Sequence, residues 1–186
     1  MVKALDVAVI VGSLRKESFN RKIALNLADL APKPLVLEIV EIGRLPLYNQ
    51  DYDAASPPEY TSFRARIKRA DAVLFVTPEH DRSMPAALKN ALDIGGRPWG
   101  QNVWAGKPAG IVSASIAATG GFGANHHLRQ SLTYLDTPTM LQPEAYLGKV
   151  DTLLDDQGKI NNDRTRKFLR AYIEAYAAWV SHFVHG

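Results

Sequence analysis

Hydroxyl, guanidinium and amide side chains gather in a short segment near the N-terminus, Gly-Ser-Leu-Arg-Lys-Glu-Ser-Phe-Asn at residues 12–20. The segment follows an unbroken apolar run, Val7–Val11, and opens into a helical pattern. A strand that turns into a helix start presents free backbone N–H groups and the positive end of the helix dipole, and both favour anions. The sequence therefore predicts a phosphate site, with side-chain donors from Ser13, Arg15, Ser18 and Asn20.

The motifs that the segment lacks limit the kind of nucleotide whose phosphate it could bind. Gly12 stands alone, so neither the G-x-G-x-x-G dinucleotide pattern nor the ATP-binding G-x-x-x-x-G-K-[ST] pattern is present. Glu41 ends the second predicted strand, where a dinucleotide-binding fold keeps its ribose-binding acid, but without the glycines we interpret it as a surface carboxylate. A mononucleotide phosphate fits the pattern best.

Two further loops hold unusual residues. One contains Pro-Glu-His-Asp-Arg-Ser-Met-Pro at 78–85, and the other runs from Ser115 to Gly123 and includes Gly120 and Gly121. A rigid proline and glycines that permit close backbone approach suit the walls around a flat ring. A phosphate loop with two such walls is the arrangement expected for flavin mononucleotide (FMN).

The elements that carry these loops alternate between strand and helix. Apolar runs predict strands at 7–11, 35–40, 72–76 and 109–113, with a short fifth strand near 139–141. Between the strands, apolar residues recur at helical spacing and predict helices, and a last helix is expected over about 163–183. The pattern predicts an α/β three-layer sandwich with a parallel five-stranded sheet in the order 2-1-3-4-5, formed by one domain over residues 1–186. Ligands then bind at the switch point between strands one and three.

Composition limits the function classes. The chain has 186 residues, 46% of them hydrophobic, with no run long enough to span a membrane and no signal-peptide pattern. It has no cysteine, which excludes disulfides and thiolate metal sites and favours the cytoplasm. The net charge of +3 is mild, and we interpret the basic residues of 64–69 and 164–170 as solvated helix faces rather than a nucleic-acid surface.

Four motifs together resemble the NADPH-dependent FMN reductase family, and especially its bacterial chromate and quinone reductases. They are the segment 12–20, Leu-Pro-Leu-Tyr-Asn-Gln-Asp at 45–51, the segment 77–93, and His-Leu-Arg-Gln-Ser-Leu at 127–132. The resemblance covers nearly the whole chain. It implies a flavodoxin-like fold, bound FMN, NADPH or NADH as reductant, and two-electron reduction of quinones through flavin N5, with chromate or azo compounds as further acceptors.

The resemblance also implies roles for particular residues, and no side chain is required as a catalytic acid or base. Five positions would hold the FMN phosphate and ribityl chain: Ser13, Arg15, Ser18, Phe19 and Asn20. Seven would line the ring: Pro78, Glu79, His80, Asp81, Ser115, Gly120 and Gly121. Arg82 is a candidate for binding the substrate. The family forms homodimers or homotetramers, with Arg129, Tyr134 and Glu144 as interface candidates. His126 and His127 are adjacent, which does not suit a metal pair, and no metal site is expected.

One departure from the family leaves alternatives open. The family has Tyr-Asn after Pro-Glu, whereas this chain has His80 and Asp81. The exchange removes an apolar ring and an amide donor, and it adds a carboxylate and an imidazole that titrates near neutral pH. We expect altered acceptor preference or pH dependence. A binding module that holds FMN poorly because of this pair is one alternative to the enzyme. A flavodoxin-like electron carrier is another, and the basic pI of about 9.1 argues against it because such carriers usually have an acidic surface.

Overall fold

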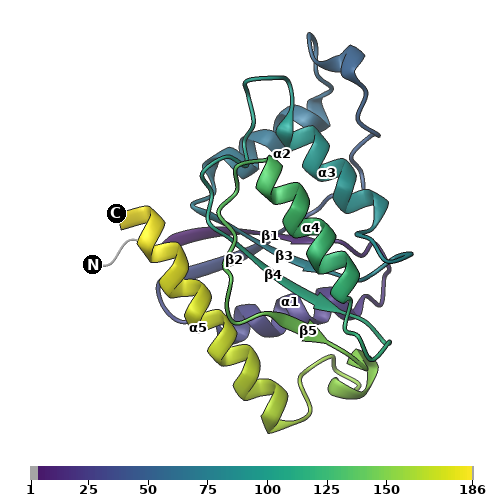
Figure 1. Cartoon of the computed structure of the whole chain (residues 1–186), viewed down its shortest axis with the longest axis vertical. Coiled ribbons are helices and arrows are strands. Elements are labelled where there is room, and N and C mark those ends of the chain that lie inside the picture. The colour runs from purple at the N-terminus through teal and green to yellow at the C-terminus, as the bar shows by residue number, and fades with distance from the viewer. Residues whose placement is uncertain (1–3, 186) are drawn as a thin grey trace.

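The computed structural model describes residues 4–185, and Figure 1 shows a central sheet between two layers of helices. The parallel sheet has the strand order β2-β1-β3-β4-β5, as the sequence predicts. Among the described residues no helix is long and apolar enough to cross a membrane. The strands are β1 (Leu5–Val11), β2 (Leu35–Val40), β3 (Ala72–Thr77), β4 (Ala109–Ala114) and β5 (Ala145–Leu147). The helices are α1 (Phe19–Leu30), α2 (Pro58–Arg69), α3 (Ala86–Gly96), α4 (Phe122–Tyr134) and α5 (Asp163–His185).

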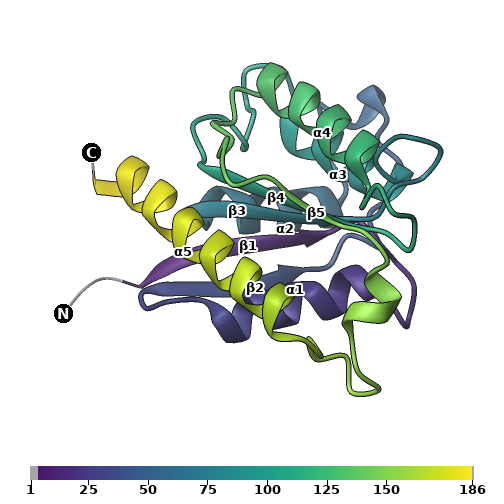
Figure 2. The same ribbon diagram turned by 60° about the horizontal axis from the view of Figure 1, so that its bottom comes forward.

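Two apolar cores, one on each face of the sheet, hold the layers together. Helices α1 and α5 pack on one face, and α2, α3 and α4 cover the other, as Figure 2 makes visible. Strands β3 and β4 are buried along their whole length because both of their faces are covered. Because the strands are parallel, the carboxyl ends of β1, β3 and β4 lie at the same edge of the sheet. Val11 of β1 is opposite Val76 of β3, and Thr77 of β3 is opposite Ser113 of β4.

The long C-terminal helix α5 packs tightly against β4. A side chain at Gly110 would place its Cβ 2.8 Å from Tyr176 Cδ2 and 2.9 Å from the Tyr172 hydroxyl, so only glycine fits between strand and helix. Burial raises the pKa of both Tyr172 and Tyr176, because the phenolate loses its hydration there. The apolar side chains that α5 contributes to this core are Leu169, Tyr172, Ile173, Tyr176 and Val180.

The predicted position of the fifth strand was wrong. Thr139 forms only an isolated parallel bridge with Ala109, and the strand itself lies beyond Pro143, at Ala145–Leu147. Proline lacks the N–H that a ladder needs, so the pairing stops and resumes after Pro143. A three-residue strand carries too little periodicity to be recognised in the sequence.

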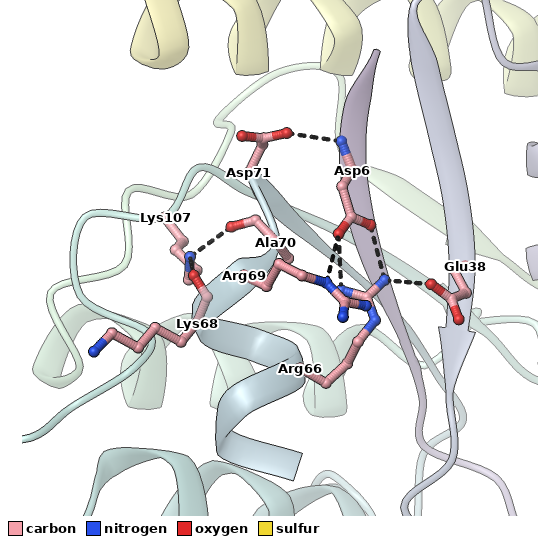
Figure 3. A network of polar contacts seen from close by, with 8 residues as sticks. All are labelled: Asp6, Glu38, Arg66, Lys68, Arg69, Ala70, Asp71 and Lys107. Atoms are coloured by element: carbon pink, nitrogen blue, oxygen red, sulfur yellow. Dashed lines mark hydrogen bonds and ion pairs between the residues drawn. The ribbon is translucent and has the colours of Figure 1, made fainter. Parts of the chain in front are cut away.

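The interpretation of residues 64–69 as a solvated face was wrong for Arg66, which joins helix α2 to the sheet (Figure 3). Its guanidinium donates to both oxygens of Asp6, at 3.1 and 2.8 Å, and to Glu38 at 2.8 Å, while its side chain is only 13% exposed. Lys107 Nζ donates to the carbonyls of Ala70 and Lys68, at 2.6 and 3.1 Å, and so satisfies carbonyls at the end of α2. Partial burial lowers the pKa of Lys107. We refer to Asp6, Glu38, Arg66 and Lys107 as the amino-end network.

Candidate functional site

The segment between β1 and α1, residues 12–18, is the one predicted to hold the phosphate, and we call it the phosphate loop. Gly12 N donates to Val76 O at 2.9 Å, and a Cβ at Gly12 would lie 2.7 Å from Thr77 Oγ1, so glycine is needed where the loop leaves the sheet. Ser18 is the N-cap of α1, and its hydroxyl accepts a hydrogen bond from Arg21 N at 3.1 Å. The local sequence thus sets a helix start directly at the end of a buried strand.

The charges on the loop favour an anion. Ser13 is half-buried, whereas Arg15 is exposed, with its guanidinium carbon 5.9 Å from the centre of the Phe19 ring. Glu17, the one acid in the loop, is paired with Lys22 at 3.0 Å, and this pairing lowers the pKa of Glu17. The first turn of α1 contains no acidic residue. The positive end of this helix is therefore not neutralised by its own sequence.

Asn20 holds a buried acceptor with no donor. Its Nδ2 donates to Ala114 O at 3.1 Å, at the carboxyl end of β4, but its Oδ1 has no hydrogen-bond partner within residues 4–185. The residue is only 3% exposed. An unpaired buried acceptor costs about 1–3 kcal/mol. A hydroxyl-bearing ligand at this edge of the sheet would satisfy it, and the ribityl chain of FMN carries such groups.

The loop after β3 (residues 78–83, the β3 loop) ends in a tight hairpin. His80 and Ser83 exchange both backbone hydrogen bonds, at 2.9 and 2.8 Å, while Asp81 and Arg82 adopt left-handed conformations with φ of 49° and 64°. These are the features of a type I′ turn, in which aspartate and asparagine are among the favoured residues. Asp81 therefore preserves the backbone that an asparagine would form, and His80, Asp81 and Arg82 are all exposed at the tip.

Glu79 links this loop to helix α4. Its side chain is only 8% exposed, and it accepts hydrogen bonds from Ala124 N at 3.1 Å and from Arg82 Nη1 at 2.7 Å. A Cβ at Gly123 would lie 2.9 Å from Glu79 Oε2, so glycine makes room for the carboxylate. Arg82, the substrate candidate, is thus tethered by Glu79 although its side chain is 77% exposed.

The loop after β4 (residues 115–121, the β4 loop) approaches β5 through glycines. Gly120 and Gly121 have φ of 61° and 79°, and a Cβ at Gly120 would lie 2.6 Å from the carbonyl carbon of Tyr146. Ser115 Oγ accepts a hydrogen bond from Ala117 N at 3.1 Å, which stabilises the start of the loop. The phosphate, β3 and β4 loops all leave the carboxyl edge of the sheet, as the predicted site requires.

The contacts of the two histidines on α4 were not predicted from the sequence. His127 Nδ1 lies 2.7 Å from Ser83 Oγ, which gives a second link between the β3 loop and α4. His126 Nε2 lies 2.9 Å from the Tyr146 hydroxyl, and burial with a nearby Glu144 raises the pKa of Tyr146 to about 12. Adjacency in the sequence indicated divergent side chains but gave no signal of their partners. No cluster of three or more metal-ligating side chains occurs among the described residues.

The three interface candidates have different surroundings. Arg129 donates to Asn125 Oδ1 at 3.1 Å and to Met140 O at 3.0 Å, so it contributes to packing within the chain. Tyr134 is 78% exposed. Glu144 lies 3.8 Å from His126 Nε2. Their role between subunits stays a prediction.

The fold and the site together define a class. A parallel sheet in the order 2-1-3-4-5 carries, at its switch point, a phosphate loop without the dinucleotide glycines. A buried acceptor next to that loop and two glycine-assisted walls complete the arrangement. These features define a flavodoxin-like protein built for a mononucleotide.

Comparisons with known proteins identify the family. The model of the NADPH-dependent FMN reductase family matches residues 5–152, and the chain belongs to this family. It is 59% identical over 181 residues to a quinone reductase of Pseudomonas putida, with 97% of each chain covered. It is 49% identical over 177 residues to a 2-hydroxy-1,4-benzoquinone reductase of a Burkholderia species, with 95% of this chain and 97% of that one covered.

A solved structure agrees with this result. The flavoenzyme NAD(P)H:(acceptor) oxidoreductase FerB of Paracoccus denitrificans superposes with a TM-score of 0.90 at 39% identity, covering 95% of this chain and 97% of that one. The predicted fold and family are therefore confirmed.

Proposed function

We propose that this protein is an FMN-dependent oxidoreductase that uses NAD(P)H to reduce quinones to hydroquinones. The reaction consumes one NAD(P)H, one quinone and one proton, and it yields NAD(P)⁺ and the hydroquinone. Membership of the FMN reductase family and the names of the two quinone reductases support the assignment. The observation that carries it within the chain is the buried Asn20 Oδ1 beside a phosphate loop with no dinucleotide glycines.

The residues around the switch point divide the work of holding the cofactor. Ser13, Arg15 and the N–H groups at the start of α1 bind the phosphate, where the helix dipole and the guanidinium both favour negative charge. Ser18 caps the helix and fixes its first turn. Phe19 flanks Arg15, and Asn20 accepts a hydrogen bond from a ribityl hydroxyl.

The two walls position the flat ring. The β3 loop supplies Pro78, His80 and Asp81, and Glu79 fixes that loop against α4. In the β4 loop, Ser115 and the backbone of Gly120 and Gly121 approach the opposite side. FMN, when bound, supplies the hydride-accepting and electron-donating chemistry, so the chain needs no obligatory acid or base. Arg82 lies at the exposed rim, where an anionic substrate would meet it.

The finer parts of the proposal concern assembly and compartment. We propose a homodimer or homotetramer that uses the α4 region, supported by the high exposure of Tyr134 and of Leu141. A cytoplasmic location is supported by the absence of cysteine and by the use of NAD(P)H. Chromate and azo compounds are further acceptors to include in any assay.

A spectroscopic experiment tests the function and separates it from its alternatives. The purified protein is expected to carry flavin absorption bands, which bleach when NADPH is added without oxygen and return when a benzoquinone follows. An electron carrier would keep oxidised bands with NADPH alone because it needs a partner protein for reduction. A colourless protein that does not take up added FMN would indicate the FMN-poor binding module.

A further inference from the structure

A groove of about 770 Å³ opens beside the phosphate loop, on the side away from the β3 and β4 loops that form the proposed walls of the FMN ring. We call it the β2 groove, and it lies between the carboxyl end of β2 and helix α2. Its apolar lining includes Leu14, Ile39 and Phe63, and its charged lining includes Arg15, Arg21 and Arg44. The volume is within the range of about 300–1,000 Å³ that is usual for small-molecule sites. A cavity of this size with apolar and cationic walls suits a ligand that has a flat base and a phosphate.

Two of the four arginines that line the groove are already committed to partners. Arg21 forms an ion pair with Glu41 at 2.7 Å, and Arg66 belongs to the amino-end network. Arg15 and Arg44, in contrast, have no ion pair with any residue that the structure describes. Arg15 belongs to the phosphate loop, so Arg44 is the guanidinium left for a second anion.

The groove and the proposed FMN site share a wall. Ser13, Leu14 and Arg15 line the groove and also form the phosphate loop. On the other side, a Cβ at Gly43 would lie 3.2 Å from Leu14 Cδ2, so the loop after β2 is in contact with the phosphate loop. The groove therefore adjoins the proposed FMN site through the phosphate loop.

The position of the groove at the end of β2 favours a nucleotide, even though the chain lacks the dinucleotide glycines. In dinucleotide-binding α/β folds, the end of the second strand carries an acid for the adenosine ribose, and a nearby arginine accommodates a 2′-phosphate. Here Glu41 follows β2 directly, and Arg44 comes three residues later. Glu41 forms an ion pair with Arg21 at 2.7 Å, which offsets part of its repulsion of a phosphate at Arg44.

We propose that the β2 groove binds the adenosine 2′-phosphate end of NADPH and that Arg44 makes the enzyme prefer NADPH to NADH. This inference rests on the proposed function, because it assigns the reductant of that reaction. The apolar lining around Phe63 takes the adenine, and Ser62 and Glu59, which also line the groove, are available to ribose hydroxyls. Arginine is suited to the role because its fork matches a phosphate group in two hydrogen bonds.

Steady-state kinetics of the holoenzyme test the preference. Arg44→Ala is expected to raise the KM for NADPH about tenfold and to change the KM for NADH less than about twofold, because only NADPH carries the 2′-phosphate. Arg44→Lys keeps the positive charge but loses the two-pronged guanidinium, so its KM for NADPH should lie between the values for the wild type and for Arg44→Ala. Arg170→Ala, on the exposed part of α5, is the matched control and should leave both KM values unchanged. Equal effects of Arg44→Ala on the two nucleotides, or a wild-type preference for NADH, would overturn the proposal.

A binding measurement needs no turnover and separates this inference from the proposed function. Calorimetric titration of the holoenzyme should show adenosine 2′,5′-bisphosphate binding at least about tenfold more tightly than 5′-AMP, with the difference lost in Arg44→Ala. If inorganic phosphate binds with the same affinity as the bisphosphate, the groove is a simple anion site and the proposal is contradicted. An enzyme that binds the bisphosphate in this way but oxidises neither nucleotide would refute the reaction while the groove assignment stands.

Discussion

The two ends of the sheet handle charge in opposite ways. At the amino end, Arg66 pairs with Asp6 and Glu38 through both of its terminal nitrogens, although its buried Nε has no hydrogen-bond partner among the described residues, and Lys107 satisfies the carbonyls that end α2 (Figure 3). At the carboxyl end, Arg15 and Arg44 have no ion pair among the described residues, and Asn20 Oδ1 has no donor. The charged groups at the amino end stabilise the folded chain, whereas those at the carboxyl end are free to bind a ligand.

Whether a charged side chain is paired within the chain distinguishes a stabilising role from a ligand-binding role more reliably than sequence composition does. The segment 64–69 and the segment 12–20 are both rich in basic and polar residues. Only burial and pairing distinguish Arg66, which is 13% exposed and bound to two carboxylates, from Arg15, which is exposed. Three variants, each with a control, test whether the two ends are as independent as this contrast implies.

The largest effect is expected at the amino end. Asp6→Ala should lower the free energy of unfolding by about 3 kcal/mol, because it leaves the largely buried Arg66 guanidinium without its bidentate partner. Urea denaturation measures the loss, and the FMN content of the folded protein should not change. Arg69→Ala is the control, since Arg69 is 68% exposed and lies 3.9 Å from Asp6, and it should cost less than about 0.5 kcal/mol. Equal losses in both variants would contradict the importance of the buried pair.

An intermediate effect is expected in the phosphate loop. Here a substitution should weaken FMN binding and leave the stability of the apoprotein nearly unchanged. Arg15→Ala should weaken FMN binding by about 2 kcal/mol, or roughly thirtyfold, while the unfolding of the apoprotein changes by less than about 0.5 kcal/mol. Fluorescence titration of the apoprotein with FMN gives the affinity. Lys16→Ala, at the adjacent exposed position, controls for loss of general positive charge. If Arg15→Ala keeps a full complement of flavin at wild-type affinity, the phosphate assignment is wrong.

The smallest effect is expected at the tip of the β3 hairpin. The double substitution His80→Tyr with Asp81→Asn should change the KM for quinones by about two- to fivefold, because both side chains are exposed at the rim of the site. Stability should hardly change, since asparagine also accepts the left-handed turn. Asp81→Asn alone separates the two contributions. Identical kinetics from about pH 6 to pH 8 in the double variant and the wild type would remove any special role for the pair.

The sequence was sufficient for the sheet order and for the loops at the switch point, because apolar runs and helix starts are local signals. It was not sufficient for β5, whose three residues follow Pro143, or for Arg66, whose carboxylates come from β1 and β2. The link from Glu79 to Ala124 and the β2 groove also depend on contacts between distant segments. The assignment of residues 1–186 to one domain stays a prediction, as do the roles of the individual site residues.

The hydrogen bond from Ala124 N to Glu79 bears on the thermodynamics of cofactor uptake. Together with the Ser83–His127 contact, it joins the β3 loop to α4 through contacts within the chain. A site whose walls are already fixed loses little conformational entropy on binding, so more of the contact energy remains as affinity. Internal contacts of this kind therefore lower the entropic cost of ordering the walls around a bound cofactor.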